Sequence, residues 1–146
     1  MININKSASW FLAALGMIWA AATFWPVSWW FDVQSVQVSD AVEGEAPKMT
    51  VVRTINRPFV ANWRVELEAK TDDGFVLIQS TDGYGRYSVD NKLPADLDLD
   101  WWTYPKQFRP APGQYRLETC WTLIIAGQLH SPLCVQSNTF TIFPVP

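Results

Sequence analysis

The chain opens with a long apolar run and then changes to an alternating pattern of apolar and polar residues. Residues 8–25 carry no charge and only one glycine, Gly16. As a helix, about eighteen such residues would extend about 27 Å, close to the roughly 30 Å hydrocarbon core of a bilayer. The pattern therefore predicts one N-terminal transmembrane helix, and residues 1–31 are expected to form a membrane anchor.

Aromatic residues border the apolar run on both sides: they are Trp10 near its start and Trp25, Trp29, Trp30 and Phe31 at its end. Indole rings favour the headgroup layer of a bilayer, so this border suits a membrane interface. Pro26 is expected to end the helix. Lys6 precedes the run and Asp32 follows it. The positive-inside rule then places the N-terminus in the cytoplasm and the rest of the chain outside.

A cleaved signal peptide is the alternative for this segment. Lys6 would supply the charged n-region, residues 10–19 the apolar region, and the alanines at 20–22 the cleavage site. The tryptophans that follow argue against cleavage, because a free mature terminus has no need of interfacial anchors. Both interpretations put the remaining chain in the same compartment.

Residues 32–146 show the period of two that is typical of half-buried antiparallel strands. The alternation is cleanest over residues 61–70, with Trp63, Val65, Leu67 and Ala69 on one face and Arg64, Glu66, Glu68 and Lys70 on the other. Further strands are expected over residues 33–38, 49–56, 75–80, 96–104, 114–125 and 133–143. Turn signals separate them at residues 72–74, 81–83, 110–113 and 126–127.

About seven short strands at roughly ten-residue spacing predict an all-β domain, an immunoglobulin-like antiparallel β-sandwich. The turn Pro112-Gly113 followed by Tyr115 favours the same fold. It is similar to the entry of the penultimate strand in such domains, where the tyrosine hydroxyl bonds back to the backbone. Cys120 stands five positions after Tyr115 rather than two, so an antibody-type disulfide is not implied.

The two cysteines, Cys120 and Cys134, are equally far from Gly127. A hairpin that turns at Gly127 brings them opposite each other, and a bridge closing a loop of about 15 residues would add about 3 kcal/mol in the chain-entropy model. Such a bridge needs an oxidising compartment. By alternation, Cys120 points away from the core face that includes Tyr115, whereas Cys134 falls on the same face as apolar Phe140. A bulge in one strand would reconcile these two assignments. The alternative is two unpaired thiols.

Charge and motif content exclude several classes of activity. The net charge is −3 with no run of basic residues, which disfavours nucleic acid as a partner. The single histidine, His130, stands in a predicted turn without a second histidine or an adjacent cysteine, and no nucleophile elbow is present. The chain is therefore expected to be neither an enzyme nor a binder of metal or cofactor.

The acidic run at residues 96–100 invites a calcium interpretation, which fails on spacing. An EF-hand loop needs glycine at its sixth position and glutamate at its twelfth. Counting from Asp96, those positions hold Trp101 and Gln107. On a strand, Asp96, Asp98 and Asp100 would instead form a solvated outer face, with the intervening leucines inward.

Exposed aromatic residues are the candidate partner-binding surface. Trp101 and Trp102 are neighbours and so point to opposite faces of a strand. If Trp101 joins the core, Trp102 and Tyr104 face out, and aromatic residues dominate interface hot spots. Tyr84 and Tyr87, in and just after an expected glycine-rich loop at residues 82–86, would extend this surface. The alternative is that residues 105–112 or the membrane-proximal linker cover Trp102.

Several short sequence features resemble small membrane-anchored proteins of unknown function that phages and prophages encode. They are Arg53-Thr-Ile-Asn-Arg57-Pro58-Phe59, Trp63, Leu99-Asp-Trp101-Trp102, Pro112-Gly113-Gln-Tyr115 and Ser137-Asn138-Thr-Phe140. The resemblance spans most of the β domain, and it implies a host-envelope setting without an assigned activity. For Arg53 and Arg57 within it, the structural alternative to a functional role is pairing with Asp or Glu at a strand end.

The combined pattern predicts a non-enzymatic binding or structural module, anchored in a bacterial inner membrane with its domain in the periplasm. We expect a lipid bilayer as one partner and a protein of an envelope or virion assembly as another. The alternative is a glycan-binding module that stacks peptidoglycan sugars on its exposed aromatics, and an envelope hydrolase is a third. Gly16 and Ala20 form a small-xxx-small pair that would allow two anchors to pack closely.

Overall fold

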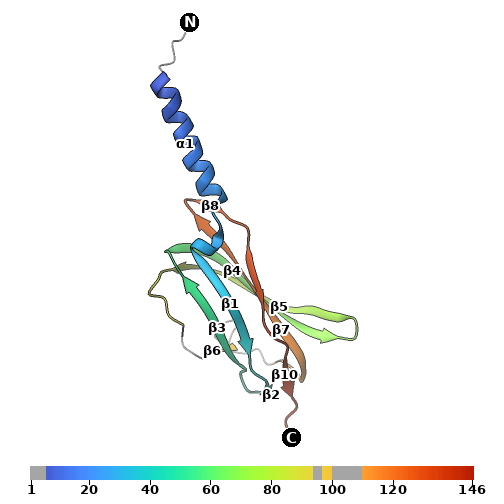
Figure 1. The fold of residues 1–146 in the computed structure, drawn as a ribbon. Coiled ribbons are helices and arrows are strands. Elements are labelled where there is room, and N and C mark those ends of the chain that lie inside the picture. Colours follow the sequence, from blue (N-terminus) through green and yellow to red (C-terminus); the bar gives the residue numbers. More distant parts are fainter. Residues whose placement is uncertain (1–5, 94–96, 100–109) are drawn as a thin grey trace.

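The computed structural model describes residues 6–93, 97–99 and 110–146 of the chain. A helix, α1 (Lys6–Phe24), leads through a 3₁₀ turn, η1 (Val27–Trp29), into a domain of β-strands (Figure 1). The strands are β1 (Phe31–Val38), β2 (Ala41–Val42), β3 (Lys48–Ile55), β4 (Phe59–Thr71), β5 (Gly74–Tyr87), β6 (Leu97–Asp98), β7 (Gly113–Ile125), β8 (Gln128–Leu129), β9 (Leu133–Gln136) and β10 (Phe140–Phe143).

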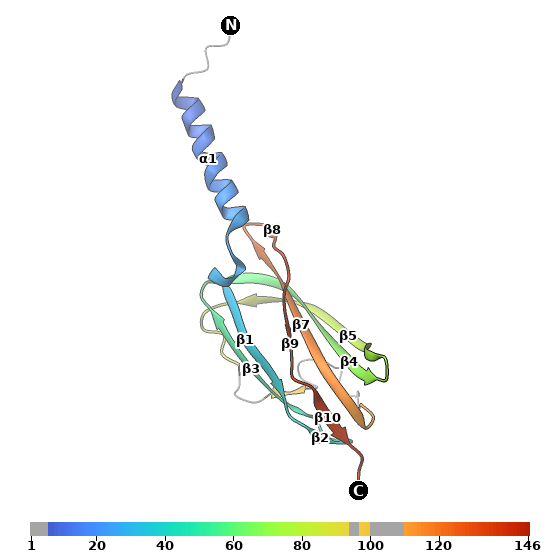
Figure 2. The ribbon, with the colours of Figure 1, turned by 45° about the vertical axis from the view of Figure 1, so that its right-hand side comes forward.

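The strands form two sheets. One has the order β1-β3-β6, and the other has the order β2-β10-β7-β4-β5, with β8 and β9 also paired to β7. Strand β2 pairs with β10 in parallel, whereas the other pairings are antiparallel. The C-terminus lies at the end of the domain opposite α1, and the β4–β5 hairpin projects from one side (Figure 2). The prediction of an all-β domain is confirmed for the described residues.

The core lies between the sheets and is built from the apolar positions that alternate along the strands. In β4, Ala61, Val65 and Leu67 are buried, while Arg64 is exposed, as the period of two predicts. The largest fully buried side chains are Trp121, Phe31, Phe140, Met49, Leu67, Leu99, Leu117, Leu123, Ile142, Val36 and Val65. Burial of this apolar surface is the main term that favours the folded state.

An aromatic cluster fills the helix-proximal end of the core. The Phe31 ring centroid lies 5.2 Å from those of Phe59 and Trp121 and 5.9 Å from that of Tyr87. Phe59 and Tyr87 stack with 4.8 Å between centroids and 4° between planes. These rings come from β1, β4, β5 and β7, so the cluster joins the two sheets.

The predicted turn at residues 81–83 is wrong, because β5 runs without interruption through it. Gly83 pairs directly with Trp63 of β4. A Cβ at position 83 would lie 2.5 Å from Cζ2 of Trp63, so the glycine provides space for an indole ring rather than a change of chain direction. The glycine-rich loop expected at residues 82–86 is therefore part of a strand.

The predicted strand over residues 133–143 is divided into β9 and β10, and this division resolves the parity conflict of the cysteines. Gln136 pairs with Glu118, and Phe140 pairs with Tyr115, so four steps along the C-terminal segment match three along β7. The extra residue moves Phe140 to the core face while Cys134 stays on the outer face. The expected bulge thus lies between the two strands.

Side chains also close the domain through hydrogen bonds. The Tyr115 hydroxyl donates to the Ala111 carbonyl oxygen at 2.6 Å, as the turn-then-tyrosine pattern predicts. Asn138 bridges to the backbone of Val38: its Oδ1 accepts from the Val38 N–H at 2.8 Å, and its Nδ2 donates to the Val38 carbonyl oxygen at 2.9 Å. Asn138 therefore ties β1 of one sheet to the segment between β9 and β10 of the other.

Helix α1 extends away from the β domain (Figure 1). Its large apolar side chains are 48% to 76% exposed: they are Trp10, Phe11, Leu12, Leu15, Met17, Ile18 and Trp19. Among the helices of the described residues, none combines the length and the apolarity that crossing a membrane requires.

Candidate functional site

The four aromatic residues expected to bind a partner do not form one described surface. Trp102 and Tyr104 lie outside the described residues. Tyr84 is 60% exposed and pairs with Asn62 on the outer face of the larger sheet. Tyr87 pairs with Phe59 on the inner face and is half-buried. The structure thus separates Tyr84 from Tyr87, and a partner-binding role for any of the four stays a prediction.

Tyr87 connects the core cluster to a neighbouring cation. One face of its ring stacks on Phe59, and the Arg53 guanidinium carbon lies 5.5 Å from its ring centroid. Burial raises the pKa of the Tyr87 phenol, while a hydrogen bond with the Trp121 side chain and the charge of Arg53 act in the opposite direction. Burial also lowers the pKa of Arg53, and Tyr87 opposes this shift. A guanidinium remains charged at any physiological pH.

The structural alternative for Arg53 and Arg57, pairing with Asp or Glu, is not seen among the described residues. Ion pairs there join Lys48 to Asp98, Arg64 to Glu66 and Arg116 to Glu68. Arg53 and Arg57 instead each lie against an aromatic ring, Arg57 at 5.4 Å from the Trp30 ring centroid. Both arginines flank strand ends beside the aromatic cluster, where π-faces are the nearest complementary groups.

Residues at the foot of α1 are fixed to the β domain. The Asn56 backbone N–H donates to the Trp30 carbonyl oxygen at 2.8 Å, and its side-chain amide donates to the Ser28 carbonyl oxygen at 3.2 Å. Trp25 packs against Trp29 and Trp30, with ring centroids 5.5 and 5.8 Å apart. The connection between helix and domain is therefore a packed aromatic junction.

The predicted disulfide between Cys120 and Cys134 is confirmed. The two residues are directly opposite on β7 and β9, with Cα atoms 4.0 Å apart, and the chain turns between them at Ala126 and Gly127, both of which have positive φ. The bridge borders a shallow concavity of about 650 Å³ on the outer face, to which Tyr84 and Asp82 also contribute. Its floor carries no cluster of metal-ligating groups within the described residues.

Two surface features were missed by the sequence reasoning. The first is an exposed apolar run on β5, where Val76, Leu77 and Ile78 are 52%, 50% and 45% exposed. The sequence did carry a signal for it, because residues 75–78 are all apolar, whereas the neighbouring strand β4 alternates apolar and polar residues. The second is a pocket of about 440 Å³ lined by Arg53, Trp63, Gly85, Arg86, Tyr87, Asn91, Lys92 and Leu93. Its residues are scattered in sequence, and no local motif marks it.

The residues considered for metal or acid–base chemistry behave as surface groups where they are described. Asp98 is exposed beside buried Leu97 and Leu99, as the strand interpretation of the acidic run predicts, whereas Asp96 and Asp100 lie outside the described residues. His130 is half-buried, and its backbone N–H donates to the Leu123 carbonyl oxygen at 2.9 Å.

Comparison with protein-family profiles, curated proteins and solved structures gives no match. The functional proposal therefore depends on the sequence and geometry of this chain. Four features stand out: the exposed apolar helix α1, the exposed apolar residues of β5 at the edge of the larger sheet, the cross-strand disulfide, and the pocket lined by cationic and aromatic residues.

Proposed function

We propose that this chain is a non-enzymatic binding module that α1 tethers to a bacterial inner membrane, with the β domain displayed at the outer face to a protein partner. The observation that carries the proposal is the exposure of the apolar side chains of α1 in all directions. Trp10, Phe11 and Leu12 are consecutive and each at least 67% exposed. Consecutive helical residues point about 100° apart, so no single face of α1 is polar there.

A helix that is apolar all round needs apolar surroundings, and within the described residues the β domain does not supply them. The sequence of residues 8–25 contains no charged residue to disfavour insertion into lipid. We assign all of residues 8–25 as the anchor. The phage-protein resemblance gives the envelope of a bacterial host as its setting.

The packed junction at the foot of α1 supports an anchor that is retained rather than cleaved. Trp25 contacts Trp29 and Trp30, and Arg57 lies over Trp30. Cleavage after the alanines at 20–22 would leave this aromatic group at a free terminus. Tryptophan and arginine side chains both suit the headgroup layer. The disulfide supports the topology, because stable bridges form in oxidising compartments.

We further assign the β domain to the immunoglobulin-like sandwiches. Three observations support this. The orders β1-β3-β6 and β10-β7-β4-β5 match the A-B-E and G-F-C-C′ arrangement of such domains. Strand β2, which follows β1 in sequence, leaves the first sheet and runs parallel to β10 in the other, as a second segment of the first strand would. Tyr115, near the start of β7, bonds back to the Ala111 carbonyl oxygen, as the corresponding tyrosine does in such domains.

Strand β5 is the surface that we assign to the protein partner. It is the last strand in the order of the larger sheet, and it carries the exposed residues Val76, Leu77 and Ile78 near the tip of a projecting hairpin (Figure 1). Natural sheets protect exposed apolar edges with charges, proline or short length, and these three positions carry none of these. An extended segment of another protein can add to such an edge as a further strand.

Membrane tethering is tested by extracting membranes of cells that express the full-length chain with alkaline carbonate. The unchanged chain should stay in the pellet and dissolve in detergent, and alkylation of unreduced samples should show no free thiol on Cys120 or Cys134. Leu15→Arg combined with Ile18→Arg should release the chain to the supernatant, whereas Leu15→Met should not. An unchanged chain that remains aqueous without detergent would refute the tether.

The partner surface is tested with a photo-crosslinking amino acid at position 77 of the full-length chain in its native envelope. A discrete adduct should form from position 77 and not from position 145, where Val145 is 63% exposed at the far end of the domain. Leu77 and Val145 are both exposed apolar positions, so the crosslinker should be equally accessible at either one, and a difference in labelling would reflect a bound partner. Equal labelling from both positions, or none from position 77, would reject β5 as the surface.

A further inference from the structure

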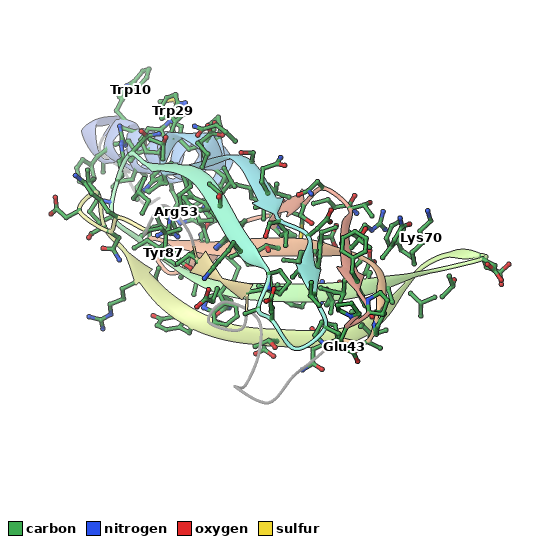
Figure 3. The ribbon with its side chains drawn as sticks, turned by 90° about the horizontal axis from the view of Figure 1, so that it is seen from below. Trp10, Trp29, Glu43, Arg53, Lys70 and Tyr87 are labelled. Carbon is green, nitrogen blue, oxygen red and sulfur yellow. A yellow bond between two sulfur atoms is a disulfide. The ribbon has the colours of Figure 1, made fainter. Side chains whose placement is uncertain are left out.

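The pocket beside Arg53, defined by the eight residues given above and here called the Arg53 pocket, lies between β3, the end of β5 and the segment that follows β5. Its volume of about 440 Å³ falls within the range of small-molecule sites. Figure 3 shows Arg53 and Tyr87 side by side, with Lys70 on the opposite side of the domain. The pocket is thus well separated from the tip of the β4–β5 hairpin.

The lining of the Arg53 pocket combines cationic and aromatic side chains. Arg53, Arg86 and Lys92 line it, and among the described residues no acidic side chain does. None of these three cations takes part in an ion pair within the described part of the chain. The remaining lining includes Trp63 and Tyr87, which offer π-faces. Three positive charges around one space, with no counter-charge from the described residues, create a field that attracts anions.

Arg53 is held against the aromatic cluster with one donor unpaired among the described residues. Its guanidinium lies over the Tyr87 ring, which is itself fixed by stacking on Phe59. Its Nε–H is buried and has no hydrogen-bond acceptor among the described residues. A buried donor without an acceptor is unfavourable, and the penalty is larger for a charged group. A ligand oxygen that reached this nitrogen would satisfy it.

We propose that the Arg53 pocket is a binding site for a phosphate group. The planar guanidinium presents paired N–H donors that match the spacing of phosphate oxygens. A phosphate monoester carries between one and two negative charges at neutral pH, which balances three cations better than a single carboxylate does. Trp63, Tyr87 and Leu93 then provide an apolar wall for the group that carries the phosphate. The site does not depend on the membrane tether.

The test uses the full-length chain in dodecyl maltoside, a detergent without phosphate, titrated with phenyl phosphate and followed by calorimetry. Binding should be saturable, and Arg53→Gln should weaken it about tenfold or more, because a charged hydrogen bond is lost. Lys92→Gln, at an exposed position, should also weaken binding without affecting folding. Lys70→Gln, on the other side of the domain, is the matched control and should leave affinity unchanged.

Two results would overturn the site: no saturable binding of phenyl phosphate by the unchanged chain, or equal affinity in Arg53→Gln, Lys92→Gln and Lys70→Gln. A second arm identifies the natural source of the phosphate. In phosphatidylglycerol nanodiscs, phenyl phosphate affinity at least fivefold weaker than in detergent would mean that lipid headgroups already occupy the pocket. Unchanged affinity would assign a soluble phosphate compound. Either result is consistent with the phosphate site itself.

Discussion

Trp63 of β4 lies directly against Gly83, its partner on β5, so closely that a Cβ at position 83 would stand 2.5 Å from Cζ2 of the indole. Gly83→Ala must therefore displace the ring or the strand. Overpacking of this kind destabilises by about 1–3 kcal/mol, and the lower half of that range is expected because Trp63 is only half-buried. Urea unfolding followed by tryptophan fluorescence measures the change.

Gly113→Ala is the matched control for Gly83→Ala. A Cβ at Gly113 would meet its nearest neighbour, Tyr115, at 3.5 Å, which is an ordinary contact. Its effect on the free energy of unfolding should stay within about 0.5 kcal/mol. Equal destabilisation by the two alanines would mean that the contact with Trp63 is not what requires glycine at position 83.

Removal of the Asn138 side chain should destabilise the domain. Asn138→Ala leaves the N–H and carbonyl oxygen of Val38 without their side-chain partners, and part-buried backbone groups left unpaired cost about 1–3 kcal/mol. Thermal or urea unfolding reads out the loss. Asn62→Ala, an exposed change on the outer face of the larger sheet, should have almost no effect. A loss no larger than that of Asn62→Ala would contradict the bridging role.

Reduction of the disulfide should lower the free energy of unfolding by about 3 kcal/mol, since the bridge joins residues 14 apart and constrains the unfolded chain. The measurement compares urea midpoints with and without dithiothreitol. A variant with Cys120→Ser and Cys134→Ser should match the reduced chain and should not respond to the reductant. If the midpoint of the unchanged chain is the same in both buffers, the predicted stabilisation is absent.

Alkaline pH should destabilise the domain through Tyr87. Burial raises the pKa of this phenol above its ordinary value of 10.0, so between the two values the unfolded chain loses a proton that the folded chain keeps. The unfolded state then binds fewer protons, and stability falls as pH rises. The stability that Tyr87 contributes is fully present below pH 10.0. It is lost as the pH rises through the raised pKa of the folded state.

The pH dependence is checked by melting temperatures from pH 8 to 11 in Tyr87→Phe and Tyr84→Phe. Tyr87→Phe should flatten the alkaline decline, apart from the part that Tyr115 contributes, whose pKa burial also raises. Tyr84 is exposed, so Tyr84→Phe should decline like the unchanged chain. Identical curves for the two variants would exclude Tyr87 as a source of the pH dependence.

Local alternation was sufficient to predict most strands and the cysteine pairing. In β4 and β7 each side chain follows the face that the period of two assigns, because these central strands pack between neighbours on both edges. The turn at Gly127 fixed the register that brings Cys120 opposite Cys134. These features depend on residues close in sequence.

Features that depend on distant residues were not predictable from the sequence. Gly83 has the local signature of a turn, and only the indole of Trp63 explains it as a strand residue. The ring that Arg53 meets is that of Tyr87, on another strand, and no pattern around position 53 indicates this contact. The pairing of β2 with β10 joins segments about one hundred residues apart, for which no local pattern exists.

The last strand, β10, has consequences for how the protein is made. Strand β2 has β10 as its neighbour in the larger sheet, and the backbone of Val38 finds its side-chain partner only in Asn138, 100 residues later. A growing polypeptide can pair β1 with β3 and β4 with β5 early, since those contacts are between successive segments. Such a chain still lacks the partner of β2 until β10 has been synthesised. Closure of the larger sheet is therefore a late event, and a chain truncated before Phe140 should leave an open, protease-sensitive intermediate.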